Sequence, residues 1–390
     1  VVLKRTYNQM EVGSRDDLKE RYDTYYVYDQ YGNLTFVIPP KVDTSIAITT
    51  DVLNNLCYQY KYDYRNRLVE KKLPGKQWEF IVYDKLDRVI ATGPAFSPFS
   101  NSPTGTVGWM ITKYDVFNRP IITGWMQSTT VTSAGRKILQ DSRNLDTILS
   151  ETKNSTATDN TVSGIAFRYS VNAFPTGTIE YYILSVTYYD DYNYLNAPTI
   201  PTGLVANQSV YYNTTIKPKG LTTGIITRIP ELTTTTPVKT ETSYSFYDIK
   251  ARGIRAYTKN HLGGFTQVDT NYETMTGRVN YTITTHNRNA TTTATQTIQD
   301  NYTYSDQDRL LSHTQSINGV QPPELIAENS YNELGQLISK KVGNTTSNPL
   351  QKVDYTYNIR GWLSEINKTG WNDSANQYPL NISGEPNDLF

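Results

Sequence analysis

The sequence contains one cysteine and only three histidines among its 390 residues. A single cysteine, Cys57, cannot form an internal disulfide, and the same count excludes zinc sites built from several cysteines. The histidines, His261, His286 and His313, are about 25 residues apart and lack the i,i+4 spacing of a helical metal site. We therefore expect structural or solvent-facing histidines, no metal and no cofactor.

An excess charge of either sign is also missing, because 37 Lys and Arg balance 37 Asp and Glu. Phosphate binding needs a basic surface, so nucleic acid is not the expected partner. No run approaches the roughly 20 apolar residues of a membrane span, so none is expected. The chain begins at Val1 without an initiator methionine or a signal-peptide pattern. We therefore expect a piece of a longer protein, whose export signal lies elsewhere.

Catalytic motifs are absent too. The sequence has no Gly-x-Ser-x-Gly elbow, phosphate loop, dinucleotide fingerprint or HExxH helix. Cys57 precedes Tyr58 in an expected strand, where a small buried apolar residue is the simpler interpretation than a nucleophile. The sequence predicts a protein that is not an enzyme.

What the sequence does have is 32 tyrosines, together with many Thr, Val and Ile residues punctuated by Asn, Gly, Pro and Asp. This composition is typical of β-strands joined by tight turns. Alternation with period two supports strands, with Trp78, Phe80 and Val82 on one face, and Tyr58, Tyr60, Tyr62 and Tyr64 on one face of another. Only residues 133–154 are expected to hold a helical turn.

A seven-residue phrase, Tyr-Asp-x-x-Gly/Asn-Arg-Leu, recurs nine times, at intervals of 21 to 34 residues where copies are adjacent. The copies begin at Tyr28, Tyr62, Tyr83, Tyr114, Tyr247, Tyr272, Tyr304, Tyr331 and Tyr357. The acid after the tyrosine can accept backbone amides at a type I turn, and Gly, Asn or Asp farther on tolerates a left-handed backbone. Each copy is therefore predicted to be the tip of a β-hairpin closed by a bulge. The expected turn residues are Asp29, Gly32, Asp63, Asn66, Asp84, Asp87, Asp115, Asn118, Gly335 and Gly361.

Nine hairpins give about 18 strands, or a ribbon roughly 85 Å wide at ~4.8 Å per strand. Such a ribbon either folds into layers or curls into a wall around a space. The abundance of tyrosine favours the curled wall, because its ring packs while its hydroxyl seeks a polar partner. The expected fold is thus all-β, an antiparallel hairpin ribbon curling into part of a hollow shell.

We expect residues 1–390 to form one such segment, made of four stretches. These are a first repeat tract (1–126), Thr- and Asn-rich strands with long loops (127–240), a second repeat tract (241–370) and a tail (371–390). Within the second stretch, strands are expected at 178–189, 209–216 and 224–229.

The densest acidic and aromatic cluster is Tyr188-Tyr189-Asp190-Asp191-Tyr192-Asn193-Tyr194. Its two aspartates are candidate cation ligands, and Tyr189, Tyr192 and Tyr194 are candidate ligand-stacking residues. The alternative is another strand end and turn, built from the same residue types as the hairpin tips.

The repeated phrase resembles the YD repeat of the Rhs family. Lys76-Gln77-Trp78-Glu79-Phe80-Ile81-Val82-Tyr83-Asp84 and Gly108-Trp109-Met110-Ile111-Thr112-Lys113-Tyr114-Asp115 further resemble the Rhs-repeat proteins of Bacteroidota. The resemblance implies a hairpin ribbon spiralled into a shell, which commonly encapsulates a C-terminal polymorphic toxin, and export that is often through the type IX system. The family's Asp-Pro-Gly self-cleavage segment has no match here, so no autoproteolytic role is assigned to any residue.

Two functions are open on the sequence alone. The first is a non-enzymatic β-shell segment of an exported, extracellular or cell-surface protein. Its partners would be the rest of its own chain, including an effector, and an outer-membrane secretion translocon. The alternative is a surface adhesin or carbohydrate-binding repeat module with exposed aromatic platforms.

Overall fold

The structure is a computed structural model, which describes residues 1–7, 21–102, 105–154, 158–176, 179–213, 215–233, 236–291 and 294–367. The expected tail, 371–390, lies outside the described residues. By residue contacts the chain divides into two compact units. Unit 1 comprises Val1–Thr187 and Ile226–Lys239, and unit 2 comprises Tyr188–Ile225 and Thr240–Phe390.

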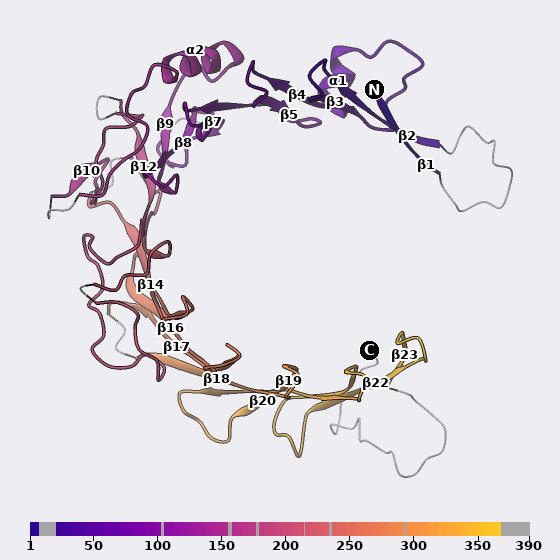
Figure 1. The fold of residues 1–390 in the computed structure, drawn as a ribbon, viewed down its shortest axis with the longest axis vertical. Coiled ribbons are helices and arrows are strands. Elements are labelled where there is room, and N and C mark those ends of the chain that lie inside the picture. The colour runs from indigo at the N-terminus through magenta and orange to yellow at the C-terminus, as the bar shows by residue number, and fades with distance from the viewer. Residues whose placement is uncertain are drawn as a thin grey trace. The chain divides into compact units, whose positions relative to one another are not determined.

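Twenty-one strands form one large sheet whose strand pairs are antiparallel, and two short strands pair separately (Figure 1). The predicted all-β class with antiparallel hairpins is confirmed. Each hairpin places consecutive strands side by side, as tight turns require. Among the described residues, β1 pairs with β2 alone and β23 with β22 alone, so the sheet is open at these two strands.

Unit 1 holds the first repeat tract and both helices. Its elements are β1 (Val2–Tyr7), β2 (Arg21–Tyr28), β3 (Leu34–Ile38), α1 (Thr50–Leu56), β4 (Tyr58–Tyr62), β5 (Leu68–Lys72), β6 (Trp78–Tyr83), β7 (Val89–Phe96), β8 (Val107–Tyr114), β9 (Pro120–Gln127), α2 (Ser133–Arg143), β10 (Asn160–Val162) and β11 (Ile165–Phe167). β12 (Tyr182–Tyr189) and β13 (Thr222–Arg228) have residues in both units. The core of unit 1 gathers around Ile111, Trp125, Phe167 and Ile183, which are almost completely buried.

The alternation predicted for β6 is present, since Phe80 and Val82 are buried. The four tyrosines predicted to share one face of β4 do not all lie in the strand. Its alternate positions hold Tyr58, Tyr60 and Tyr62. Tyr64 lies beyond the end of the strand, at an exposed turn, and the residue that β4 buries is Gln59. The polar side chain of Gln59 is accommodated there because its amide donates to the carbonyl of Leu53 in the last turn of α1, 3.0 Å away.

The prediction that helix is confined to residues 133–154 was wrong. α2 lies there, but α1 forms outside that range, with Thr49 as its N-cap accepting from the Val52 amide. The Cys57 amide closes the other end by donating to Leu53. Because a seven-residue helix is shorter than two turns, its cap pattern was hidden by the surrounding strand-like composition.

Unit 2 holds the second repeat tract. Its strands are β14 (Thr240–Tyr247), β15 (Gly253–Lys259), β16 (Gly263–Tyr272), β17 (Val279–Asn289), β18 (Gln296–Tyr304), β19 (Leu310–Ile317), β20 (Glu324–Tyr331), β21 (Leu337–Val342), β22 (Gln351–Tyr357) and β23 (Leu363–Ile366). Phe246, Ile254 and Leu325 are buried, but most strand residues are half-buried.

The strand predicted at 209–216 was wrong, because the described residues of that segment form a loop. The loop is anchored at one end, where the Tyr211 amide donates to the Tyr247 carbonyl, 2.7 Å away. Farther on, the Asn213 side chain accepts the Thr215 and Ile216 amides, which turns the chain back on itself. The alternating sequence is outweighed by this local turn chemistry.

Candidate functional site

The hairpin tips share one local geometry, seen clearly at Tyr62–Leu68. The Asp63 amide donates to the Arg67 carbonyl and the Asn66 amide to the Asp63 carbonyl, each at 3.0 Å. The Asp63 carboxylate accepts the backbone amides of Arg65 and Arg67 through Oδ1. The strand register shifts by one residue between Lys61 and Tyr62, so a bulge closes the loop. The acid thus supplies acceptors for amides that the turn leaves without partners.

A left-handed backbone occurs at the fourth residue after the tyrosine in eight of the nine tips. The φ angles there are +83° at Gly32, +59° at Asn66, +61° at Asp87, +63° at Asn118, +62° at Ala251, +63° at Asp308, +81° at Gly335 and +79° at Gly361. The tip at Tyr272 is one residue longer, and its Gly277 has φ +80°. Ala251 is the only one of these residues without a polar side chain or glycine's freedom.

The next residue connects several tips to their neighbours, a role that the sequence analysis did not assign. The Arg67 guanidinium pairs with Asp63 of its own tip, 2.7 Å away, and with Asp87 of the following tip, 2.8 Å away. It also lies over the ring of Tyr83, 4.7 Å from the centroid. In return, the Tyr83 hydroxyl donates to the carbonyl of Leu68, 2.7 Å away. We call this reciprocal set of contacts a tip joint.

The tip joint recurs in both units. Arg88 pairs with Asp84, donates to Asn118 and lies over Tyr114, whose hydroxyl donates to Val89. In unit 2, Arg252 pairs with Asp248 and lies over Tyr272, whose hydroxyl donates to Gly253. Further copies of all or part of the joint are Arg278 with Asp308 and Tyr304, Arg309 with Tyr331, and Tyr357 with Leu337. Six of the nine phrases carry arginine at this position, and this recurrence is the sequence signal that could have revealed the joint.

The Asp63 carboxylate is held in its charged form. Burial raises the pKa of Asp63, but hydrogen bonds from the Arg67 side chain and from backbone amides outweigh it, and the net pKa is lowered. Burial also opposes charge on Arg67, yet the bonds to Asp63 and Asp87 raise its pKa. Groups so firmly ionised are poor general acids or bases near neutral pH. Their chemistry suits structural ion pairs.

The predicted ligand-stacking tyrosines lie near the start of unit 2 and are not exposed platforms. Tyr192 and Tyr194 are buried, and their hydroxyls donate to the carbonyls of Ser245 and Thr223. The Tyr194 ring stacks on Tyr188 with centroids 4.3 Å apart. Burial raises the pKa of both hydroxyls far above the ordinary tyrosine value. Because the rings of Tyr192 and Tyr194 are buried, the geometry speaks against ligand stacking at these two residues. Tyr189 is half-buried.

The candidate cation ligands have structural partners. Asp190 has a left-handed backbone and accepts the Gly220 amide, and Asp191 accepts the Asn193 amide. In the described part of the chain, no three His, Cys, Asp or Glu side chains gather as a metal site. His261 contacts Glu241, His286 contacts Thr266 and His313 contacts Asp300.

Cys57 is completely buried, and burial raises the pKa of its thiol. A buried thiol with a raised pKa is a poor nucleophile. No described helix is both long and apolar enough to cross a membrane.

A buried ion pair, which sequence reasoning missed, fixes the segment after α2 to the sheet of unit 1. Lys113 Nζ lies 2.8 Å from Glu151 Oε1, and neither side chain is exposed. Glu151 also accepts the Ser170 hydroxyl and the amides of Asn172 and Ala173. Lys113 also donates to the Ala173 carbonyl, so both members of the ion pair make further hydrogen bonds. A buried ion pair bonded in this way indicates a structural role.

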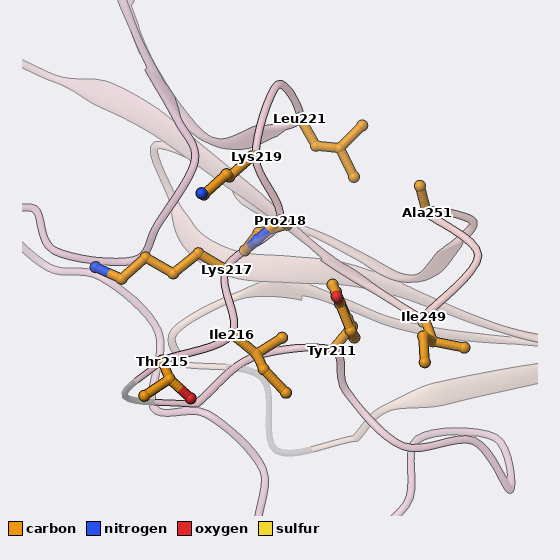
Figure 2. A pocket seen from close by; sticks show the side chains of 9 residues that line it. All are labelled: Tyr211, Thr215, Ile216, Lys217, Pro218, Lys219, Leu221, Ile249 and Ala251. Carbon is orange, nitrogen blue, oxygen red and sulfur yellow. The ribbon is translucent and has the colours of Figure 1, made fainter.

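Two adjoining pockets in unit 2, of about 390 and 690 Å³, lie between the 207–221 loop and the tip that begins at Tyr247. Tyr211, Ile216 and Ile249 line both. Figure 2 shows the smaller pocket, where the Lys217 and Lys219 ammonium groups lie on one side and Ile249 and Ala251 on the other. The larger pocket is lined by amide side chains, among them Asn207 and Gln208.

No protein-family model matches the chain, and no curated protein matches it. Solved structures do match at low identity. The crystal structure of TcdB2-TccC3 is 12% identical with a TM-score of 0.33, over 87% of this chain and 15% of that one. TcdB2-TccC3 without its hypervariable C-terminal region is 12% identical with a TM-score of 0.32, over 88% and 15%. The Photorhabdus luminescens Tc holotoxin pore is 11% identical with a TM-score of 0.32, over 88% and 15%. The chain spans about 15% of the length of each of these solved chains.

Proposed function

We propose that the chain is a non-enzymatic β-shell segment of a large exported protein of the Rhs family, which encapsulates or carries a C-terminal effector. The observation that carries this proposal is the tip joint. Arg88 and Arg252 each pair with the acid of their own tip and lie over the tyrosine of the following tip, although they belong to different repeat tracts. A ribbon joined in this way extends by adding the same hairpin again, which is what a wall requires.

The chemistry of the wall supports this role. Tyrosine hydroxyls at the joints bind backbone carbonyls of the neighbouring hairpin, as Tyr83 does with Leu68. Their rings contribute apolar packing at the same time, so the sheet holds together without a thick dry core. Most strand residues of unit 2 are half-buried, which agrees with a sheet that has a wet side.

We further propose that the parent protein is exported to the cell surface or beyond, through a type IX translocon if it is a Bacteroidota member. The partners would be the rest of the same chain and its effector. These proposals rest on the resemblance of the repeated phrase to the YD repeat.

Limited proteolysis of the parent protein tests encapsulation. An epitope tag is placed in the segment that follows Phe390 in the parent, and digestion of the tag is followed by immunoblot. We expect the tag to be protected in the native protein and digested once the wall is opened by Arg88→Ala together with Arg252→Ala. Arg360→Ala is the matched control, because Arg360 is an exposed tip arginine whose guanidinium lies over the ring of Trp362 in the same tip. Equal digestion of the tag in native and denatured protein would rule out a container.

The adhesin or carbohydrate-binding alternative is favoured by one observation, the larger pocket of unit 2. Its Asn207, Ser209 and Tyr211 side chains are of the kinds that hydrogen-bond and stack on sugars. A glycan array probed with the wild-type chain and with Tyr211→Ala tests this role. Binding that Tyr211→Ala abolishes would support it, and no binding to any glycan would reject it.

A further inference from the structure

The two central positions of the hairpin turns carry large apolar side chains that point into solvent. Eight of the nine tips have at least one, and the most exposed of each tip has an exposed fraction between 54% and 104%. These residues are Tyr31, Tyr64, Leu86, Phe117, Ile249, Met275, Leu334 and Ile359. The remaining tip has Asp306 and Gln307 at the same positions. Single exposed apolar residues are ordinary on a protein surface, but recurrence at the same position of successive tips makes this series a candidate interaction surface.

Turn closure does not require these apolar residues. The polar tip closes with the same bonds as the others, from the Asp308 amide to the Ser305 carbonyl at 3.1 Å and from the Ser305 amide to the Arg309 carbonyl at 2.9 Å. The corresponding distances at Asp63 are both 3.0 Å. The central positions of a type I turn accept most residue types. A separate role is therefore needed to explain apolar residues there.

The tips of unit 1 form a continuous row, which we call the tip row and define as Tyr31, Tyr64, Leu86 and Phe117. Contacts between neighbouring tips hold it together: Asn33 donates to Asn66, Arg67 pairs with Asp87 and Arg88 donates to Asn118. Each hairpin contributes two strands, so consecutive members of the row are spaced by roughly 10 Å.

We propose that the tip row binds the tip row of a second copy of this chain, in an antiparallel arrangement that places Tyr64 of one copy against Leu86 of the other. A second copy has the same spacing, so apolar side chains can interdigitate along the whole row. A two-fold axis through the middle of the row makes the contact self-complementary.

Charge favours a second copy as the occupant. The four tip phrases of unit 1 carry five basic and five acidic side chains, which cancel. Asp63, Asp84 and Asp115 are each paired with the arginine of the same tip. The row therefore neither repels its own copy nor offers the excess positive charge that anionic lipids or nucleic acids need.

The area of the row sets the strength of the contact. Four exposed side chains of this size bury roughly 500 Å² per copy, against ~800 Å² per partner in a standard interface. The dimer is expected to be weak, and its population should rise with protein concentration. The inference of a dimer is independent of the proposed shell function.

Sedimentation velocity over a hundredfold range of concentration tests the proposal. We expect the mass of the wild-type chain to rise from monomer toward dimer, and the variant Tyr31→Asn/Tyr64→Asn/Leu86→Asn/Phe117→Asn to remain monomeric. Asparagine suits turn positions, so the hairpins should persist. The matched control, Gln30→Asn/Lys85→Asn, changes polar residues of the same turns and should dimerise like wild type. A monomeric wild type, or a quadruple variant that still dimerises, would overturn the proposal.

Disulfide trapping keeps the test decisive if the quadruple variant unfolds. Chains with Tyr64→Cys and chains with Leu86→Cys, both in a Cys57→Ser background, are mixed under mild oxidation. We expect mixed disulfide dimers to form faster in this mixture than in a second mixture, in which chains with Glu79→Cys replace those with Leu86→Cys. Glu79 lies within strand β6 and not at a tip. Equal rates for the two mixtures would reject the antiparallel row. Binding of a monomeric chain to zwitterionic vesicles, lost in the quadruple variant, would assign the row to a lipid surface and also overturn the proposal.

Discussion

The hydroxyl of Tyr83 donates to the carbonyl of Leu68, and the guanidinium of the neighbouring Arg67 lies 4.7 Å from the centre of the Tyr83 ring. One tyrosine thus makes two contacts with the preceding hairpin. Its hydroxyl bonds a backbone carbonyl, and the face of its ring packs against an arginine. Because the arrangement recurs at Tyr114 and Tyr272, substitutions at a joint should weaken two hairpins at once.

Arg88→Ala should destabilise unit 1 more than Arg65→Ala. Arg88 is buried and donates to Asp84, Asn118 and the Leu149 carbonyl, so its loss should cost about 2 kcal/mol, as for hydrogen bonds to charged groups. Arg65 makes an exposed pair with Asp87, and such pairs contribute ~0–1 kcal/mol. Urea denaturation of the two variants checks the difference. Equal losses would show that the joint adds nothing beyond a surface ion pair.

Asp63→Ala and Asp84→Ala should each destabilise their hairpin by about 0.5–2 kcal/mol, by analogy with lost helix caps. Asp84 is buried and bound to Arg88, so the larger loss is expected at Asp84. Hydrogen exchange of the amides at positions 86 and 88, which donate to Asp84, locates the effect. If both variants melt like wild type, the aspartates do not support the turns.

Ala251→Gly should stabilise the chain. Ala251 has φ +62°, and a left-handed backbone costs a residue with a Cβ about 1–2 kcal/mol, part of which glycine's greater freedom in the unfolded chain offsets. Thermal melts should show a small rise in midpoint. The control is Gly253→Ala two residues away, where an added Cβ meets no atom within 4 Å and φ is not left-handed. That change should not lower the midpoint, and a loss of stability in Ala251→Gly would contradict the strain argument.

Glu273 should make the stability of unit 2 depend on acidity. The Met275 and Thr276 amides lower the pKa of Glu273 from 4.5 to about 2. Because the folded pKa lies below the unfolded value, its contribution is complete above about pH 4.5 and is lost as the pH falls toward 2. Glu273→Gln should therefore melt below wild type at neutral pH, and the gap should narrow with acid. Glu333→Gln, at another exposed tip, provides the comparison, and a gap independent of pH would refute the assignment.

Lys113→Met alone should destabilise unit 1 by roughly 3–5 kcal/mol, because it leaves the buried Glu151 carboxyl group without its partner. Burial lowers the pKa of Lys113, because removal from water disfavours the charged ammonium group. The double variant Lys113→Met/Glu151→Gln should recover much of the loss. Denaturation of both variants measures the coupling, and additive losses would mean that the pair is not a unit.

The turns were predictable because their determinants are local. Asp63 and Asn66 lie within one turn, so residue type and spacing suffice to place the acceptor and the left-handed residue. Alternation was a poorer guide at Tyr64, which continues the alternating tyrosines of β4 in sequence but lies at the turn. Alternation does not show where a strand ends.

The contacts across hairpins were not predictable in the same way. Arg67 and Asp87 are separated by 20 residues, and Lys113 and Glu151 by 38. Nothing in the residue types around Glu151 distinguishes it from an exposed glutamate. Tyr192 and Tyr194 looked like exposed platforms for the same reason, since only packing against Phe246 and Tyr188 buries their rings.

The sequence by itself determined the antiparallel hairpins and the positions of their tips, because turn preferences and strand alternation act over a few residues. Only the tertiary structure decided which arginine reaches which tip, which acids are buried and which tyrosines are covered. Those outcomes depend on the pairing of strands whose residues are distant along the chain, and on the loss of water that this pairing brings.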